Sequence, residues 1–269
     1  MLDAQQIQYH IGNRPIVNRA SIQVLPGELT AILGPNGAGK STLFRLLSGE
    51  LSCKQGLITY NEQPLKGMKT RQLASLRAVM PQHSTLTFPF QAKEVVSLGL
   101  MYCRPNYPKM ILKEVMSATQ TWQLKDKLYG NLSGGEKQRV QLARVLAQIW
   151  EIKATPRYLL LDEPTSSMDI AQQHHIMQII QHLKMRNIGI LAILHDLNLA
   201  ANYADKVLLL KQGKVLHQGA VRTVMTPENL QGLFDYPLSV QMDGPNNPIY
   251  ISSLPSSATS SKNYTYKLA

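Results

Sequence analysis

The sequence contains little cysteine, is short of acidic residues and has no long apolar run. Its two cysteines, Cys53 and Cys103, lie in unrelated contexts without the spacing of metal ligands. This pattern indicates ordinary thiols in a reducing compartment, and it gives no support for a disulfide framework or a zinc site. No apolar run approaches the roughly 18 residues that a membrane-spanning helix requires. The start, MLDAQQIQYH, also lacks the basic and apolar segments of a secretion signal, so we expect a chain that does not itself cross a membrane.

The shortage of acidic residues leaves a strongly basic protein. The chain has 28 Lys and Arg against 17 Asp and Glu, which gives a formal net charge of +11. Residues 45–127 alone hold 12 Lys and Arg against 5 Asp and Glu, a local excess of 7. Nucleic acid, anionic lipid headgroups or an acidic partner surface would each match this charge, and so would a simple solvated face. Charge alone therefore leaves the meaning of the basic excess open.

Short apolar segments alternate with amphipathic ones along most of the chain. This alternation predicts an α/β fold with a mostly parallel sheet that is covered on both faces. We expect β-strands at 6–9, 21–24, 29–33, 57–60, 158–161, 189–193, 207–210 and 215–217, and helices at 40–47, 93–98, 112–122, 134–148 and 171–185.

The predicted elements divide the chain into three parts. Residues 87–150 read as almost entirely helical, which indicates a helical subdomain inserted into an α/β core formed by residues 1–86 and 151–240. Residues 241–269 end in the run SSLPSSATSSKNYTYK, which is rich in Ser and Thr and has no periodicity. Such a composition is typical of a mobile tail, and we expect one here.

A phosphate-binding loop follows the predicted strand LTAIL and precedes the helical run LFRLLSG. Its glycines allow the backbone to wrap around phosphate groups with the N–H groups pointing inward, and the N-terminus of the following helix attracts anions. The lysine ammonium is placed to reach the β- and γ-phosphates of ATP, and Ser41 offers a hydroxyl to Mg²⁺. The residues of this loop are Gly34, Pro35, Asn36, Gly37, Ala38, Gly39, Lys40, Ser41 and Thr42.

Two carboxylates end the apolar segment RYLLLDE. The carboxyl end of a buried parallel strand is where ligand sites of α/β proteins lie. Asp162 is therefore placed to hold Mg²⁺ through water, and Glu163 to act as the general base that polarises the attacking water. An acidic pair that merely caps the next turn is the alternative, but the phosphate-binding loop in the same chain argues against it.

The run from Leu132 to Arg139, LSGGEKQR, comes immediately before a long predicted helix. A hydroxyl and glycine N–H groups at a helix N-terminus make a second anion site. Here the chain resembles the nucleotide-binding subunits of ABC transporters, because this run is the signature sequence of that family. The resemblance implies that Ser133, Gly134 and Gly135 close over an ATP molecule bound to a second copy of the chain, in a head-to-tail dimer. It also implies a P-loop NTPase core of RecA type, with a mostly parallel sheet, an antiparallel β subdomain and an inserted α-helical subdomain.

Other residues match motifs of the same family in the same order. Gln82, in VMPQH, matches the glutamine that senses Mg²⁺, water and the membrane partner. Asp169 ends the segment SSMD, where the family more often has Ala-Leu in place of Ser-Met. His195 matches the histidine that contacts the γ-phosphate, and Tyr9 the aromatic residue that stacks on adenine, with the neighbouring His10 a weaker candidate. His174 and His175 match no motif, and we expect both to be exposed.

Several segments narrow the resemblance to one branch of the family. PQHSTLTFPFQAKEVVSLG and LHDLNLAANYADKVLLLKQGKVLHQG resemble importers of iron-siderophores, cobalamin and haem, and the longer connection at 148–157 is most similar to the ATP-binding subunits of haem (hemin) importers. The resemblance implies an ATPase on the cytoplasmic face of the inner membrane. Its partners would be two copies of an integral membrane permease and, indirectly, a periplasmic substrate-binding protein. A siderophore or cobalamin importer is the alternative.

A different class is an ABC ATPase that acts on nucleic acid or ribosomes, with the basic helical region as the binding surface. Family members of that class carry very long coiled coils or two fused cassettes, and this sequence has neither. Its basic residues also lack the interleaved aromatic residues that stack on bases. We therefore expect no nucleic-acid partner.

Overall fold

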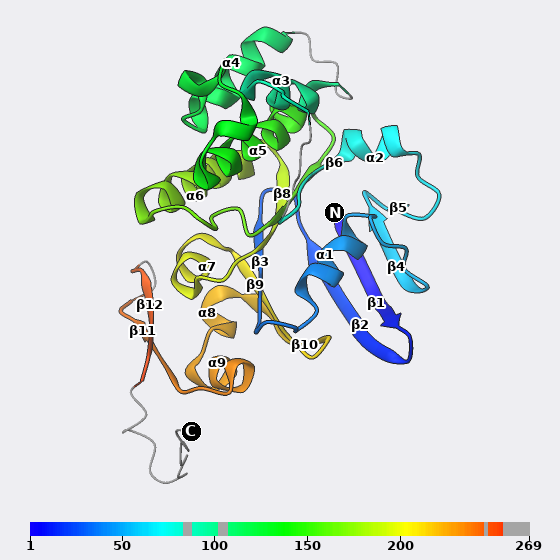
Figure 1. The fold of residues 1–269 in the computed structure, drawn as a ribbon. Coiled ribbons are helices and arrows are strands. Elements are labelled where there is room, and N and C mark those ends of the chain that lie inside the picture. Colours follow the sequence, from blue (N-terminus) through cyan, green and yellow to red (C-terminus); the bar gives the residue numbers. More distant parts are fainter. Residues whose placement is uncertain (83–87, 102–106, 245–246, 255–269) are drawn as a thin grey trace, which may run out of the picture.

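The computed structural model describes residues 1–82, 88–101, 107–244 and 247–254. In these residues the main sheet has six strands in the order β10-β9-β3-β8-β7-β6 (Figure 1). From β9 to β6 all neighbouring strands run parallel, whereas the edge strand β10 runs antiparallel to β9. The bounds are β3 (Leu29–Leu33), β6 (Arg77–Met80), β7 (Arg157–Asp162), β8 (Ile188–Ile193), β9 (Lys206–Lys211) and β10 (Lys214–Ala220).

The central strands are parallel because their sequences suit burial on both faces. Every residue of β3, β7 and β8 is buried, and each strand is an almost uninterrupted apolar run. Such strands need helices on both sides of the sheet, since neither face tolerates water. The outer strand β10 has a mostly exposed pattern, which suits the antiparallel edge of such a sheet. These parallel strands confirm the predicted α/β fold class.

A second sheet of four antiparallel strands lies beside the first, in the order β2-β1-β4-β5. It supplies the antiparallel part that the family resemblance implied, and its strands are longer than the sequence patterns predicted. Tyr60, the last residue of β4 in this sheet, is fully buried, and its hydroxyl donates a 2.8 Å hydrogen bond to the Leu47 carbonyl of the first helix. The strands are β1 (Leu2–Ile11), β2 (Arg14–Val24), β4 (Gln55–Tyr60) and β5 (Gln63–Pro64).

The chain between β6 and β7 is mainly helical, and Figure 1 shows these helices gathered at one end of the molecule. The apolar faces of α3 (Ala92–Ser97), α4 (Pro108–Ala118) and α5 (Gly134–Ile149) pack together in one core cluster. Three short 3₁₀ segments connect them, namely η1 (Leu98–Leu100), η2 (Trp122–Leu124) and η3 (Tyr129–Asn131).

Helix α4 lies four residues earlier than the predicted helix 112–122. It begins at Pro108, because a proline in the first turn has the helical φ and needs no N–H partner there. It ends before Gln120, whose φ of 54° is left-handed. The buried hydroxyls of Thr119 and Thr121 satisfy the last carbonyls, since Thr119 donates to Val115 and Thr121 to Met116.

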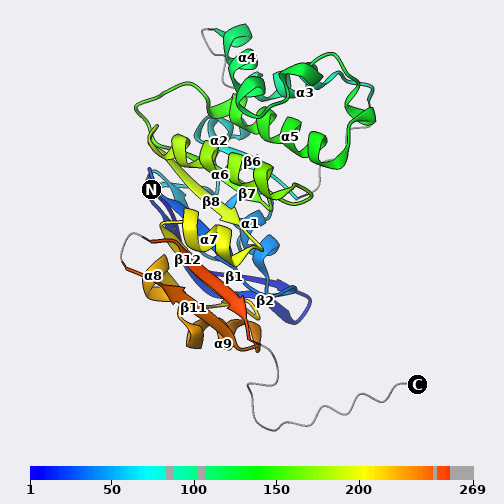
Figure 2. The same cartoon turned by 90° about the vertical axis from the view of Figure 1, so that its left-hand side faces the viewer.

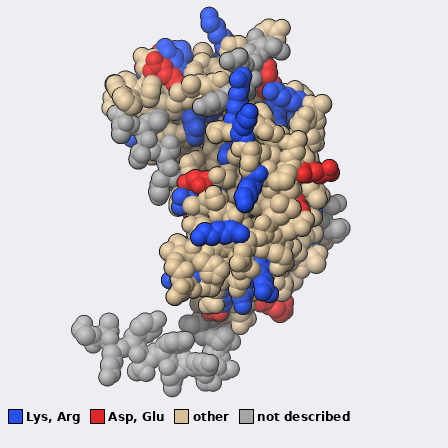
Figure 3. Space-filling view, turned by 90° about the vertical axis from the view of Figure 1, so that its right-hand side faces the viewer, with Lys and Arg blue, Asp and Glu red and all other residues tan. Residues whose placement is uncertain are grey.

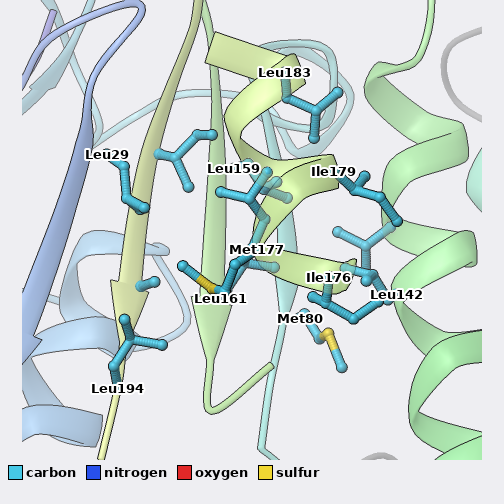
Figure 4. Close-up of a cluster of buried hydrophobic side chains, with 14 of the residues drawn as sticks. Leu29, Met80, Leu142, Leu159, Leu161, Ile176, Met177, Ile179, Leu183 and Leu194 are labelled. Carbon is cyan, nitrogen blue, oxygen red and sulfur yellow. The ribbon is translucent and has the colours of Figure 1, made fainter. Parts of the chain in front are cut away.

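The remaining helices cover the two faces of the main sheet. Helices α1 and α6 match the predicted ranges, whereas α2, α7, α8 and α9 were not predicted. Leu159 and Leu161 of the central strand β7 meet Ile176 and Met177 of α6 in the buried cluster of Figure 4. The bounds are α1 (Lys40–Leu47), α2 (Thr70–Leu76), α6 (Ile170–Lys184), α7 (Leu197–Tyr203), α8 (Val221–Val224) and α9 (Pro227–Phe234).

The structure corrects the expectation of a mobile tail that begins at residue 241. Strands β11 (Leu238–Met242) and β12 (Ile249–Ser253) pair as an antiparallel hairpin, and Figure 2 shows it lying over α7 and α8. Ile249 and Ile251 are buried in the core, at 2% and 8% exposure, which explains why this segment is ordered. The expectation for 255–269 lies outside the described residues, and so does Cys103.

Candidate active site

The phosphate-binding loop connects β3 to α1 and is held by close backbone contacts. A Cβ atom on Gly34 would lie 2.1 Å from the Leu210 carbonyl oxygen, so only glycine fits there. Gly39 has a φ of 99°, and a Cβ atom there would lie 2.6 Å from the Ile16 carbonyl oxygen. The loop is further tied to the β9–β10 turn by a 2.8 Å hydrogen bond from the Gly213 N–H to the Ala38 carbonyl. The glycines therefore serve close approach and a left-handed turn, as phosphate-binding loops require.

Lys40 is the first residue of α1, and only 7% of it is exposed. Its ammonium donates hydrogen bonds to the carbonyl oxygens of Gly34 and Pro35, at 2.7 and 3.0 Å. Burial lowers the pKa of Lys40, while the nearby charges of Glu163 and Asp162 act in the opposite direction. The lysine, the loop and both carboxylates are thus brought together, although more than 100 residues separate them in the sequence.

Asp162 is the last residue of β7, and Glu163 follows it directly. Asp162 is buried at 5% exposure. Glu163 has a φ of 55°, a left-handed conformation that is uncommon for a residue other than glycine. Its carbonyl accepts hydrogen bonds from the side chains of Gln138, at 2.8 Å, and Ser166, at 3.1 Å, which help to hold this conformation. Backbone strain of this kind persists only where neighbouring groups fix it, and it is concentrated at functional sites.

His195 follows strand β8, and its Nε2 lies 2.5 Å from Oε1 of Glu163. The carboxylate side chain of Glu163 is 16% exposed, whereas the imidazole is 48% exposed and open to a ligand. The next residue, Asp196, is the N-cap of α7 and accepts hydrogen bonds from the N–H groups of Asn198 and Leu199. The helix start therefore fixes the backbone on the C-terminal side of the histidine.

A pocket of about 420 Å³ lies beside this pair. Gln82, Gly134, Gln138 and Glu163 all line it, so the structure brings the predicted glutamine and part of the signature run to the predicted base. Gln138 was not predicted as a site residue. Gln138 connects the start of α5 to the segment that follows β7, because its side-chain amide donates to the Glu163 carbonyl and also to the Ser166 hydroxyl, at 2.9 Å. Its position within the signature run was the only signal in the sequence.

Ser133 and Asp169 are both helix N-caps. The Ser133 hydroxyl accepts a 3.3 Å hydrogen bond from the Glu136 N–H, and the Glu136 carboxylate accepts a 2.8 Å bond from the Ser133 N–H. The bond from the Ser133 N–H to the carboxylate is the main cause of a lowered pKa of Glu136. Asp169 caps α6 by accepting from the Gln172 N–H at 2.8 Å. A helix N-terminus with a capping hydroxyl and two following glycines is suited to bind an anion.

Tyr9 lies in β1 and does not line the pocket beside Glu163. It pairs with Val17 across β1 and β2, next to Ile16, whose carbonyl approaches the phosphate-binding loop. Its side chain is partly buried, while that of the neighbouring His10 is exposed. The adenine contact of Tyr9 stays a prediction.

Of the two histidines expected to be exposed, only His174 is. His175 is half-buried, because its Nε2 lies 2.7 Å from the Ala118 carbonyl of α4. Its ring lies in the contact between α6 and the helices that precede the signature run.

The donor set near Lys40 suits a hard cation. Ser41 presents an exposed hydroxyl at the start of α1, and Asp162 a carboxylate at the end of β7. Within the described residues no group of three or more His, Cys, Asp or Glu side chains is able to hold a metal ion by itself. Mg²⁺ is commonly held by one or two protein oxygens together with water and nucleotide phosphates, so this sparse set fits it.

The comparison with protein families decides the class. The ABC transporter family model matches residues 17–166, which is more than half of the chain. The chain belongs to the ABC transporter family. This match covers the phosphate-binding loop, the signature run and the carboxylates of β7, and the ABC chain is accordingly an ATP-binding ATPase. In the described residues no helix is both long enough and apolar enough to cross a membrane.

Three curated relatives of this ABC ATPase are named hemin import ATP-binding protein HmuV. The protein from Gloeobacter violaceus is 45% identical over 85% of each chain. The protein from Bartonella henselae is 44% identical, over 89% of this chain and 92% of the relative. The protein from Escherichia coli O157:H7 is 41% identical, over 92% of this chain and 97% of the relative.

Solved structures confirm the ABC fold at lower identity. A metal-chelate type ABC transporter in an inward-facing conformation matches with a TM-score of 0.77 and 23% identity, over 96% of this chain and 98% of that chain. A dimeric ATP-binding cassette bound to ADP and phosphate matches with a TM-score of 0.72 and 22% identity, over 82% of this chain and 99% of that chain. At these identities the likeness concerns the fold alone.

Proposed function

We propose that the chain is the ATP-hydrolysing subunit of an importer that takes up haem across the inner membrane. One observation supports the hydrolytic role most strongly, namely the cluster in which Glu163 lies against His195 and close to Lys40. The three relatives named for hemin import, each more than 40% identical over most of the chain, support haem as the cargo.

Binding of ATP uses the backbone and one lysine. Backbone N–H groups of residues 36–42 surround the phosphates, and the Lys40 ammonium exchanges the Gly34 and Pro35 carbonyls for β- and γ-phosphate oxygens. Tyr9 provides the adenine contact. Ser41, Asp162 and Gln82 would hold Mg²⁺, which offsets the negative charge of the phosphates when it is bound.

Hydrolysis depends on Glu163 as the general base. Its carboxylate accepts a proton from the attacking water, which raises the nucleophilicity of the water oxygen toward the γ-phosphorus. His195 holds Oε1 of that carboxylate and contacts the γ-phosphate with its exposed ring. Gln138 keeps the glutamate backbone in place through the Glu163 carbonyl.

The anion site at the start of α5 supports a dimer. The chain already has one complete phosphate cradle, so Ser133, Gly134 and Gly135 are available for the nucleotide of a second copy, with Asp169 at the same contact. Two copies packed head to tail then enclose two ATP molecules, and closure depends on the bound nucleotide.

Closure of the dimer would be transmitted to two copies of a membrane permease on the cytoplasmic face of the membrane. The route is the helical region and the Gln82 segment, which together line one pocket with the general base. A periplasmic binding protein delivers the cargo to the permease and does not touch this chain. Lys and Arg side chains are more prominent than Asp and Glu on the face shown in Figure 3. We assign this basic face no nucleic-acid role.

Reconstitution with the permease partner of this chain and its binding protein tests the proposal. The binding protein is added empty, or loaded with haem, with a ferric siderophore or with cobalamin, and ATP hydrolysis is measured in each case. Stimulation by haem alone is expected. Stimulation by a siderophore or cobalamin but not by haem would overturn the assignment of haem as the cargo. Retention of the chain on nucleic acid, without co-purification of the permease, would overturn the transport role.

A further inference from the structure

Two asparagines of α7 hold the backbone of strand β12. The side-chain amide of Asn198 donates to the Ile251 carbonyl at 3.1 Å and accepts from the Ile251 N–H at 2.8 Å. Asn202, one helical turn later, makes the same two bonds to Ile249, both at 2.9 Å. Each asparagine therefore pairs with β12 as a neighbouring peptide group would. Helix α7 takes the place of a third strand along this edge of the hairpin.

Side-chain burial adds to this attachment. Ile249 and Ile251 lie in the same core cluster as Leu199 and Ala200 of α7. The alternation along β12 leaves Tyr250 between them exposed, so one face of the strand is packed on the core and the other faces solvent. Backbone bonds and buried side chains thus fix the hairpin to one short helix, α7, beside which it lies in Figure 2.

A continuous set of bonds leads from the hairpin to the hydrolytic pair. The backbone N–H of Asn198 donates to the Asp196 carboxylate at 2.7 Å, so one residue is bonded both to β12 and to the helix cap. Asp196 is adjacent to His195, whose ring lies against Glu163. Asn202 has no such bond to the cap, since the Asp196 carboxylate accepts from Asn198 and Leu199.

We infer that Asn198 is a positioning residue for ATP hydrolysis, which anchors the first turn of α7 to the C-terminal hairpin and so holds His195 against Glu163. This inference rests on the proposed roles of His195 and Glu163. The hairpin acts as a brace for α7, whose N-cap Asp196 directly follows His195. Because misplacing a reacting group by 1 Å costs up to about 100-fold in rate, a smaller displacement of His195 is expected to lower turnover about tenfold.

The test compares two variants that each remove one pair of side-chain bonds to β12, Asn198→Leu and Asn202→Leu. Asn202→Leu also removes the 2.8 Å bond from the Asn202 amide to the Asn198 carbonyl, so it is the more severe loss of bonds. Leucine favours the helix in both cases. Hydrogen exchange at the Ile249 and Ile251 amides measures the release of β12, and thermal unfolding checks that both variants fold. Steady-state ATPase assays give kcat and KM. Asn198→Asp is the conservative variant, because its carboxylate still accepts from the Ile251 N–H but cannot donate to the carbonyl.

We expect kcat to fall about tenfold in Asn198→Leu with KM for ATP unchanged, to fall less than about threefold in Asn202→Leu, and to be intermediate in Asn198→Asp. Equal losses of kcat in both leucine variants would overturn the inference, because a general loss of stability predicts that result. An unchanged kcat in Asn198→Leu despite faster exchange at Ile251 would also overturn it.

His195→Ala is measured in parallel. Full activity in that variant would contradict the proposed catalytic role itself, and the positioning inference would fall with it.

Discussion

The Nε2 atom of His195 and the Oε1 atom of Glu163 lie 2.5 Å apart, although 32 residues separate them in the chain. The two residues follow the neighbouring parallel strands β8 and β7, whose carboxyl ends lie at the same edge of the sheet. This edge is where ligand sites of open α/β sheets occur. The pair therefore places a carboxylate and a partly exposed imidazole side by side, close to Lys40 of the phosphate-binding loop.

The Glu163→Gln variant tests whether Glu163 is the general base of ATP hydrolysis. Glutamine keeps the size of the side chain and is able to contact His195, but its neutral amide does not accept a proton from water. Turnover is expected to fall by roughly 100- to 10,000-fold, the usual contribution of general-base catalysis, while ATP binding is retained. ATPase assays and equilibrium nucleotide binding measure the two effects separately. Normal hydrolysis by this variant would remove Glu163 as the base.

Ser133→Arg and Ser133→Asp test the dimer. Aspartate is as good an N-cap as serine, so the α5 start is preserved, but its charge repels a phosphate group. Arginine blocks the same position by size. Both variants are expected to bind ATP as the wild-type monomer does and to lose hydrolysis and ATP-dependent dimerisation, measured by light scattering. Full activity in both variants would show that the two copies do not share a site.

The Lys40→Met variant tests whether the Lys40 ammonium binds the phosphates of ATP. The variant removes a charge-assisted bond to phosphate, which is worth about 1.5–3 kcal/mol, so ATP affinity is expected to fall roughly 10- to 100-fold. Lys109→Met is the matched control, since Lys109 is exposed on α4 and should leave affinity unchanged. Isothermal titration with ATP makes the comparison. Equal affinities of the two variants would contradict the assigned role of Lys40.

The Tyr158 hydroxyl is expected to make the folded protein less stable at alkaline pH. Burial raises the pKa of its hydroxyl to about 12 from an ordinary value of 10.0. Because the folded state holds this proton more tightly, the stabilisation is complete below pH 10 and is lost as pH rises toward 12. The hydroxyl donates a 2.7 Å hydrogen bond to Asn61, which ionisation would break. Urea unfolding between pH 9 and pH 11 is expected to show a weaker pH dependence in Tyr158→Phe; an unchanged dependence would exclude Tyr158 as its source.

The sequence predicted the local parts of the site well. Helix α1 was predicted at 40–47 with both ends correct, because the apolar strand before it, the glycine-rich loop and the helical run after it all lie within 20 residues. The carboxylates at the end of β7 were noticed for the same reason, since an apolar run that leads to Asp162 and Glu163 is a local pattern. Patterns of this kind need no knowledge of distant contacts.

Features that depend on distant residues were not predicted. The left-handed backbone of Glu163 is supported by Gln138, which is 25 residues away. Most of the hairpin, residues 241–253, was taken for part of a tail because its order depends on Asn198 and Asn202, which lie 53 and 47 residues away from their partners in β12. Asparagine on a helix carries no signal of strand pairing, so periodicity could not reveal this contact.

The most direct test of the central proposal is ATP-driven haem uptake into vesicles that contain the permease and this chain. Haem loaded on the binding protein is supplied on the periplasmic side, and haem inside the vesicles is measured by its absorbance. We expect haem to accumulate inside the vesicles only when ATP is present, and this accumulation to be lost with Glu163→Gln. Uptake that continues at the same rate with Glu163→Gln, or hydrolysis of ATP without any haem accumulation by the wild-type complex, would contradict it.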